Sequence, residues 1–239
     1  MGSAVEKPEN IDIRKLFDGI AGRYDFLNRL LSLGIDVWWR RQAVSRLRVG
    51  PGERVLDLAC GTADVALEIA RRHPDGGIIV AADFSLEMLR LAQAKIARAG
   101  QSGRIFPVAA RCEALPHPDR TFDAAVIAFG IRNVSDRLGV LRELFRVLRP
   151  GGRLAVLELS TPANPLIRAI YHGYFRTLLP WLAGFFAGRA AYRYLPASVA
   201  GFPAADRFRL LLEEAGFDDI VQQPLTFGIA TLHCGRRPE

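Results

Sequence analysis

The chain has 239 residues, of which 50% are hydrophobic and 24% charged, a composition typical of a folded protein with a substantial apolar core. This composition excludes intrinsically disordered and fibrous classes, and the lack of about 20 successive apolar residues argues against a membrane span. The formal net charge is +7, but the basic residues are scattered along the sequence, so a nucleic-acid partner is not expected.

Cysteine usage and the polar start of the chain both favour a cytoplasmic location. Cys60, Cys112 and Cys234 are odd in number and form no C-x-x-C pair, so neither a disulfide framework nor a structural zinc site is expected. The histidines show no spacing typical of metal ligands, and no metal site is predicted. The first ten residues contain no apolar signal-peptide segment, so a cytoplasmic location is expected.

The order of apolar patterns along the chain predicts the fold class. Apolar residues recur at helical spacing over 12–48, and Gly50, Pro51 and Gly52 end that part. Beyond it, short apolar runs alternate with helical patterns. Strands are predicted at 54–59, 78–83, 105–109, 122–128 and 153–159, and helices at 64–72, 85–99 and 137–148. Continuous apolar strands separated by helices predict an α/β fold with a doubly wound, mostly parallel sheet.

The C-terminal third departs from this alternation. Residues 160–203 are rich in aromatic, Leu, Ala and Gly residues and are predicted to form a helical insertion. A helix at 210–215 and a final strand at 225–234, antiparallel to the others, are expected to follow. The predicted organisation is therefore a helical cap over 1–50 and one α/β domain over 51–239 that carries the insertion.

The loop after the first strand indicates the kind of ligand. A dinucleotide-binding loop would read G-x-G-x-x-G, whereas only Gly61 is present here, together with Asp57 at the end of the strand. An acidic loop without a phosphate cradle favours a cationic ligand such as S-adenosylmethionine. Asp83, at the end of the second strand, is suited to accept hydrogen bonds from ribose hydroxyls. The alternatives are that Asp57 caps a turn and that Asp83 caps the next helix.

Several longer motifs carry a resemblance to a known family. They are Tyr24-Asp-Phe-Leu-Asn28, Val55-Leu-Asp-Leu-Ala-Cys-Gly-Thr62, Phe129-Gly-Ile-Arg-Asn133 and the Pro-Gly-Gly segment within 146–154. Over residues 11–235 the chain resembles the ubiquinone/menaquinone-biosynthesis C-methyltransferases. The resemblance implies a Rossmann-like class I methyltransferase with a seven-stranded sheet and S-adenosylmethionine as cofactor. It also implies a polyprenylated quinol as substrate, demethylmenaquinol first and a 2-methoxy-6-polyprenyl-1,4-benzoquinol second.

The resemblance also assigns the cofactor positions. These carry over onto Thr62, Asp83, Arg111, Cys112 and Ala128, beside the Asp57 and Gly61 already singled out. This sequence departs from the family at four places: Ala63 replaces Gly, Arg111 a short Asp or Asn, Ala128 a Ser and Asp36 a His. If residue 63 has a positive φ, its alanine costs about 1 kcal/mol. Arg111 is expected to leave the adenine contact to the Cys112 backbone.

Catalytic roles follow from the two most family-specific motifs. Arg132 is expected to stabilise the ionised ring oxygen, with Asn133 beside it. Tyr24 and Asn28 are expected to close the pocket, and Asp25 or Tyr24 to help move the proton. The alternatives are that Arg132 only pairs with Asp136 or Asp25, and that Tyr24 only packs.

The insertion is the candidate for contact with the prenyl chain. Between Leu166 and Tyr194, Trp181, Phe185 and Phe186 lie among arginines, a mixture that suits either a lid or a peripheral membrane surface. Two alternative functions stay open: methylation of another lipophilic phenol, and a non-catalytic subunit that retains the fold. The oligomeric state is left open as well.

Overall fold

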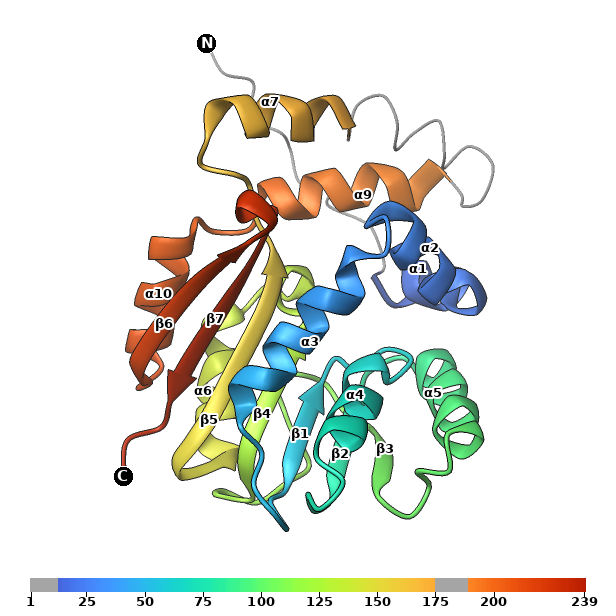
Figure 1. The fold of residues 1–239 in the computed structure, drawn as a ribbon, viewed down its shortest axis with the longest axis vertical. Coiled ribbons are helices and arrows are strands. Elements are labelled where there is room, and N and C mark those ends of the chain that lie inside the picture. The colour runs from blue at the N-terminus through green and yellow to red at the C-terminus, as the bar shows by residue number, and fades with distance from the viewer. Residues whose placement is uncertain (1–12, 175–188) are drawn as a thin grey trace.

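One twisted sheet organises the computed structural model, which describes residues 13–174 and 189–239 (Figure 1). Its strand order is β3-β2-β1-β4-β5-β7-β6, and every neighbouring pair is parallel except the two that involve β7. The strands are β1 Val55–Leu58, β2 Ile79–Asp83, β3 Ile105–Ala109, β4 Phe122–Ala128, β5 Leu148–Leu159, β6 Asp218–Leu225 and β7 Ala230–Arg236. Chain order reverses between β1 and β4, which is where such sheets bind ligands.

Helices cover both faces of the sheet. The described helices are α1 Ile13–Ile20, α2 Tyr24–Leu31, α3 Ile35–Leu47, α4 Asp64–Arg72, α5 Leu86–Arg98, α6 Arg137–Val147, α7 Pro165–Gly173, α9 Arg189–Ala200 and α10 Ala205–Glu214, with short 3₁₀ turns η1 Ala21–Arg23, η2 Ile131–Asn133 and η4 Thr226–Gly228. α3, α4 and α5 pack on one face around Val44, Leu47 and Ile69, and α6 and α10 pack on the other. The predicted doubly wound architecture is confirmed.

Two predicted boundaries were wrong. β5 begins at Leu148, directly after α6, and runs through the Pro-Gly-Gly segment that was expected to be a loop. The region predicted as a single final strand holds β7, which is antiparallel as expected, and β6 before it was missed. β6 lies at the sheet edge and reads Asp-Asp-Ile-Val-Gln-Gln-Pro-Leu. It lacks the apolar run of a buried strand, and it contains a proline, which central strands avoid but edge strands tolerate.

The remaining helices lie over the carboxyl ends of the parallel strands. In Figure 1, α1, α2, α7 and α9 gather at that end of the sheet, while α3 descends from them along one sheet face. α7 and α9 fall within the predicted insertion, whereas Trp181, Phe185 and Phe186 lie outside the described residues. Within the described ranges, no helix is both long enough and apolar enough to cross a membrane.

Local sequence signals explain how the helices near the cavities begin. Ser85 caps α5 by accepting a hydrogen bond from the Met88 amide, as its position predicted. Asp64 is the first residue of α4, where its negative charge meets the positive end of the helix dipole. These two helix starts follow β1 and β2 directly and border the loops that line the cavities described below.

His233 gives the fold a pH dependence that can be measured. Its ring is buried in β7 against Phe208, and burial lowers its pKa from 6.5 to about 4. Because the unfolded chain takes up this proton at higher pH, stability falls as pH drops below 6.5, by about 3 kcal/mol at pH 4. Urea unfolding of wild type and His233→Leu from pH 8 to pH 4 should show a smaller loss in the variant. Identical pH dependence in both proteins would refute this assignment.

Candidate active site

Two cavities meet over the carboxyl ends of β1, β2 and β4. The larger has a volume of about 620 Å³ and the smaller, lined mainly by apolar side chains and called here the apolar cavity, about 340 Å³. Phe17, Tyr24 and Phe129 line both cavities, so these rings lie at the boundary between them.

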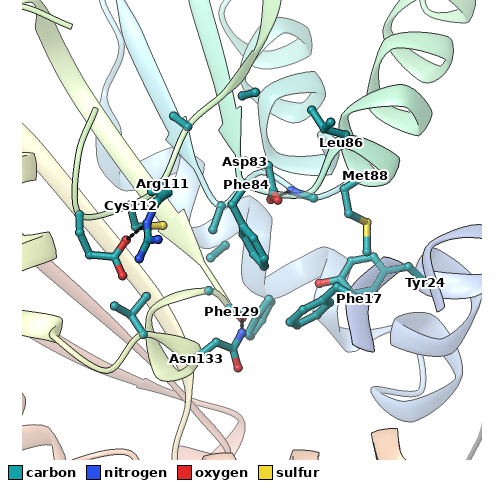
Figure 2. Close-up of a pocket in the computed structure, with 18 of the residues that line it drawn as sticks. Phe17, Tyr24, Asp83, Phe84, Leu86, Met88, Arg111, Cys112, Phe129 and Asn133 are labelled. Carbon is teal, nitrogen blue, oxygen red and sulfur yellow. Dashed lines mark hydrogen bonds and ion pairs between the residues drawn. The ribbon is translucent and has the colours of Figure 1, made fainter. Parts of the chain in front are cut away.

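Asp83 and the loop after β1 form the polar centre of the larger cavity (Figure 2). The buried Asp83 carboxylate accepts hydrogen bonds from the Gly61 amide at 2.8 Å and the Ser85 amide at 2.9 Å. Burial nevertheless raises its pKa, because the two amides offset only part of the desolvation. Asp83 is thus not the cap of α5, which is Ser85, but it binds the amide of that cap residue and faces the cavity.

Residues 111, 112 and 128 border this cavity opposite the loop after β1. Cys112 is buried there, and burial raises the pKa of its thiol to about 12. The Arg111 side chain is 78% exposed and pairs with Glu113 at 3.6 Å, so it lies at the rim rather than in the wall. Ala128 lines the cavity at the end of β4. Its methyl group offers no polar contact, so any hydrogen bond at this position must come from the backbone.

Asp57 and Thr62 lie beneath the loop instead of facing the larger cavity. Asp57 accepts a hydrogen bond from the Ala66 amide in the first turn of α4, which is the capping role considered as an alternative. Both line a pocket of about 20 Å³, roughly the size of one water molecule, that also reaches Tyr24. Burial raises the pKa of Asp57 to about 8.

The same loop requires left-handed backbone conformations. Ala59, Gly61 and Ala63 have φ values of 53°, 54° and 66°. Ala63 therefore has the positive φ on which the sequence argument depended, and its Cβ costs about 1 kcal/mol relative to glycine. Phe129, across the cavity, has a φ of 61°. Strained residues of this kind cluster at functional sites, where the surrounding fold holds them.

Tyr24, Asn28 and Arg132 line the apolar cavity, as the family motifs predicted. Burial raises the pKa of the Tyr24 hydroxyl, and the positive charges of Arg40 and Arg132, together with the Asn28 side chain, act in the opposite direction. The cavity's other polar lining residues are Ser32, Asp36, Arg40 and Thr226. The rest of the lining is apolar or aromatic and includes Ile20, Leu27, Leu31, Leu33, Ile35, Trp39, Leu159, Ile167, Ile170, Leu195 and Ile229. The cavity thus combines a few charged side chains with a mostly apolar wall.

Glu158, not Asp136 or Asp25, is the ion-pair partner of Arg132. The Arg132 side chain is 9% exposed, and its Nη1 lies 2.7 Å from the fully buried Glu158 carboxylate and 2.6 Å from the Phe129 carbonyl oxygen. Burial disfavours the charged guanidinium, but the Glu158 charge outweighs this and the pKa of Arg132 is raised. Its Nε is buried without a hydrogen-bond partner among the described residues. The guanidinium is therefore fixed yet retains a free donor.

Asn133 connects this site to the insertion. Its amide oxygen accepts a hydrogen bond from the Tyr194 hydroxyl on α9 at 2.9 Å, and its side chain lines the larger cavity. Neither Glu158 nor Tyr194 was identified from the sequence. Glu158 carried a usable signal, since it is a single carboxylate at the end of an otherwise apolar predicted strand.

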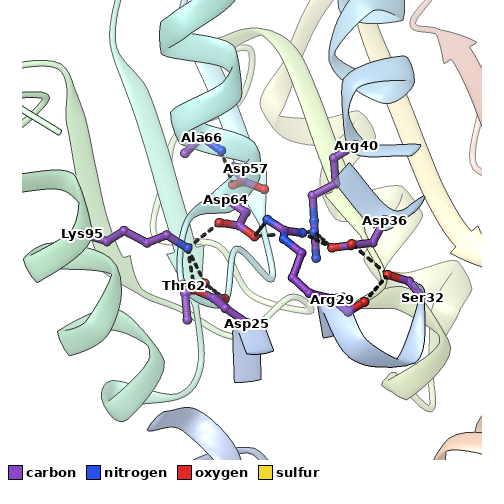
Figure 3. A network of polar contacts seen from close by, with 10 residues as sticks. All are labelled: Asp25, Arg29, Ser32, Asp36, Arg40, Asp57, Thr62, Asp64, Ala66 and Lys95. Atoms are coloured by element: carbon purple, nitrogen blue, oxygen red, sulfur yellow. Dashed lines mark hydrogen bonds and ion pairs between the residues drawn. The ribbon is translucent and has the colours of Figure 1, made fainter. Parts of the chain in front are cut away.

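A cluster of six charged side chains joins α2 and α3 to the loop after β1 (Figure 3). It consists of Asp25, Arg29, Asp36, Arg40, Asp64 and Lys95. Asp25 accepts a hydrogen bond from Thr62 at 2.5 Å and pairs with Lys95 at 2.6 Å, so it faces the cluster and not the apolar cavity. Because Asp25 follows Tyr24 in the chain, the contacts of Asp25 with Thr62 and Lys95 also restrict where Tyr24 can lie.

The ion pair of Arg132 with Glu158 can be tested through stability. Glu158→Leu leaves the Arg132 charge buried without its partner and should cost about 3 kcal/mol, whereas adding Arg132→Met should recover at least half of that loss. The exposed pair of Arg209 with Glu213 is the control, and Glu213→Ala should cost less than about 0.5 kcal/mol. Urea unfolding measures all three variants. Equal costs for Glu158→Leu and Glu213→Ala would contradict the buried pair.

In the described part of the chain, no group of three His, Cys, Asp or Glu side chains is arranged to hold a metal ion. The ionisable groups near the boundary of the two cavities include Asp83 on one side and Arg132 on the other.

Solved structures similar to this one share the fold. The [4+2]-cyclase SpnF matches with a TM-score of 0.69 at 18% identity, over 95% of each chain. An S-adenosylmethionine-dependent methyltransferase from Aquifex aeolicus matches with a TM-score of 0.62 at 18% identity, over 84% of this chain and 91% of that one. At this identity the likeness concerns architecture alone.

Curated relatives are similar over nearly the whole sequence. A protein named ubiquinone/menaquinone biosynthesis C-methyltransferase UbiE, from Geobacter sulfurreducens, is 51% identical over 97% of this chain and 90% of its own. A demethylmenaquinone methyltransferase from Thermus thermophilus is 46% identical over 93% of this chain and 100% of its own. The model of the ubiE/COQ5 methyltransferase family matches residues 4–237, which confirms the resemblance seen in the motifs. The chain belongs to the ubiE/COQ5 methyltransferase family.

Proposed function

We propose that this protein transfers a methyl group from S-adenosylmethionine to a ring carbon of a polyprenylated quinol, demethylmenaquinol first. The observation that carries the proposal is the junction of the two cavities at Tyr24 and Phe129. One cavity offers a buried carboxylate and backbone amides to a nucleoside, and the other offers an apolar wall with arginines at its inner end. The names of the relatives from Geobacter sulfurreducens and Thermus thermophilus support the substrate class.

The larger cavity has the donor and acceptor set that S-adenosylmethionine needs. Asp83 accepts from the ribose hydroxyls, and the buried segment at Cys112 provides the wall for the adenine. Gly61 suits this loop because its φ of 54° favours glycine, and a Cβ at this position would lie 3.5 Å from the Tyr24 ring. When bound, the cofactor supplies a sulfonium methyl group that a nucleophilic carbon can attack.

The residues of the apolar cavity prepare that carbon. A quinol ring carbon becomes nucleophilic when the adjacent hydroxyl ionises, which costs about 4 kcal/mol at pH 7 for a phenol with a pKa of about 10. Arg132, fixed by Glu158, stabilises the resulting oxyanion through its free guanidinium donors. Tyr24 and Asn28 orient the ring and help to carry its proton toward solvent. Phe17, Tyr24 and Phe129 exclude water from the junction and bring the two ligands together.

Two other functions are distinguished by the same assay. The apolar lining also suits another lipophilic phenol, and a non-catalytic subunit would retain the fold with weak cofactor binding. Purified protein is incubated with S-adenosylmethionine and short-chain demethylmenaquinol, the corresponding benzoquinol or a simple naphthol, and methylated products are identified by mass spectrometry. We expect the demethylmenaquinol analogue to be methylated fastest and the cofactor to bind with micromolar affinity in calorimetry. Absence of methyl transfer to any quinol would contradict the proposal.

Arg132→Gln tests the role of the guanidinium in this reaction. Removing the charge that stabilises the oxyanion should lower turnover at least 100-fold, which is about the loss seen when an enzyme loses one hydrogen-bond donor to an oxyanion. Cofactor affinity should stay unchanged. Arg137→Gln is the matched control, since Arg137 sits on the neighbouring turn, donates to the Arg132 carbonyl and lines neither cavity. Unchanged turnover in a folded Arg132→Gln protein would exclude this role.

Exposed apolar residues at the mouth of the apolar cavity support peripheral membrane contact. Leu33 and Ile170 line that cavity and are 71% and 65% exposed, and Leu166 lies beside the latter on α7. We expect the protein to bind vesicles containing anionic lipid and Leu33→Glu with Ile170→Glu to weaken that binding at least fivefold. Phe106→Glu, on edge strand β3, is the control. No co-sedimentation, even with quinol in the vesicles, would count against membrane contact.

A further inference from the structure

Arg40 is a buried cation that the family motifs did not place in the reaction. It lies on α3, is 7% exposed, and lines both the apolar cavity and the small pocket beneath the loop. Its guanidinium carbon lies 5.5 Å from the centre of the Phe129 ring. Phe129 separates the two cavities, so Arg40 flanks the place where the ligands meet.

Two carboxylates hold Arg40 in place through a single nitrogen. Nη1 contacts Asp36, one turn earlier on α3, and lies 3.5 Å from Asp64 at the start of α4. Among the described residues, no hydrogen bond involves Nε or Nη2 of Arg40, and neither atom is among the fully buried unpaired ones. Because a guanidinium carries five N–H donors, Arg40 can donate to an acceptor in the cavity that it lines.

The charges that line the apolar cavity leave it positive. Its titratable and charged side chains come from α2, α3, η2, α7 and α9 and are Tyr24, Asp36, Arg40, Arg132, Tyr171, Tyr174 and Tyr194. Two of the lining groups are cations and one is a carboxylate. From outside the cavity, Glu158 pairs with Arg132 and Arg29 shares Asp36, so each cavity cation has at least one carboxylate partner and Asp36 has a second cation. The inner end of the cavity therefore favours an anion, and an ionised ring hydroxyl is the anion that the proposed reaction forms.

We propose that Arg40 supplies, beside Arg132, the second positive charge that stabilises the ionised quinol, with Asp36 and Asp64 fixing its position. This inference rests on the proposed function and names a residue of the same site. Asp36, which departs from the family's usual His, thereby sets the charge beside the quinol ring. Its carboxylate anchors Arg40 and offsets part of the positive charge of Arg40.

The charge cluster contains a matched control. Arg29 contacts the same two carboxylates as Arg40, namely Asp36 and Asp64, but it does not line either large cavity. In Arg40→Met, Asp36 keeps Arg29 and Asp64 keeps Lys95, so no buried carboxylate is left unpaired. In Arg29→Met the same carboxylates keep Arg40. The two variants thus lose ion pairs to the same two carboxylates and differ in whether a charge leaves the cavity, although the Arg29 side chain is 38% exposed and that of Arg40 9%.

The test is the pH dependence of methyl transfer in single turnovers at saturating cofactor and quinol. In Arg40→Met we expect the acid limb to move up by about one pH unit and the rate at pH 7 to fall about tenfold. Cofactor affinity, measured by calorimetry, should change less than about twofold. Arg40→Lys should restore most of the rate, and Arg29→Met should keep the wild-type profile.

Asp36→Asn provides a prediction of opposite sign that does not depend on Arg40→Met folding. It removes the carboxylate that lines the cavity while keeping a hydrogen-bonding side chain for Arg40 and Ser32, so the acid limb should move to lower pH. An unchanged acid limb in both Arg40→Met and Asp36→Asn, or an equal shift in Arg29→Met, would overturn the inference. A wild-type protein that methylates no quinol at any pH would instead contradict the proposed function.

Discussion

The ion pairs between α2, α3 and the loop after β1 determine where Tyr24 lies. Asp25, the next residue, is held by Thr62 and Lys95, and Arg29, one turn further, is held by Asp36 and Asp64. These contacts come from α3, α4, α5 and the loop after β1, so the position of Tyr24 depends on the whole cluster. Because the Tyr24 ring forms part of the wall between the two cavities, the cluster also sets the gap across which a methyl group would move.

Backbone strain complements these charges. Ala59 and Ala63 lie in left-handed conformations within the same loop, and Phe129 does so on the opposite side. Each conformation costs free energy that the buried core beneath it must offset. The result is a loop whose Gly61 amide donates to Asp83 and a Phe129 ring that lies at the boundary of the two cavities.

The sequence predicted the elements with strong local signals and missed the partners that only the sheet brings together. The buried strands and the Ser85 cap were predictable because apolar runs and capping residues act over a few positions. Glu158 meets Arg132 because Ala128 and Leu157 are paired between parallel β4 and β5, a register that no local pattern contains. β6 was missed because an edge strand tolerates charged residues and proline. Arg111 was foreseen at the cavity but stands at its rim.

The proposed reaction requires that cofactor and quinol ring occupy separate cavities and face each other between Tyr24 and Phe129. A crystal structure with S-adenosylhomocysteine and a short-chain menaquinone bound together tests this arrangement directly. We expect the adenosine between Asp83 and Cys112, the quinone ring beside Arg132 and Arg40, and the thioether sulfur facing the ring across the gap. A quinone ring bound outside the apolar cavity, or an adenosine away from Asp83, would contradict it.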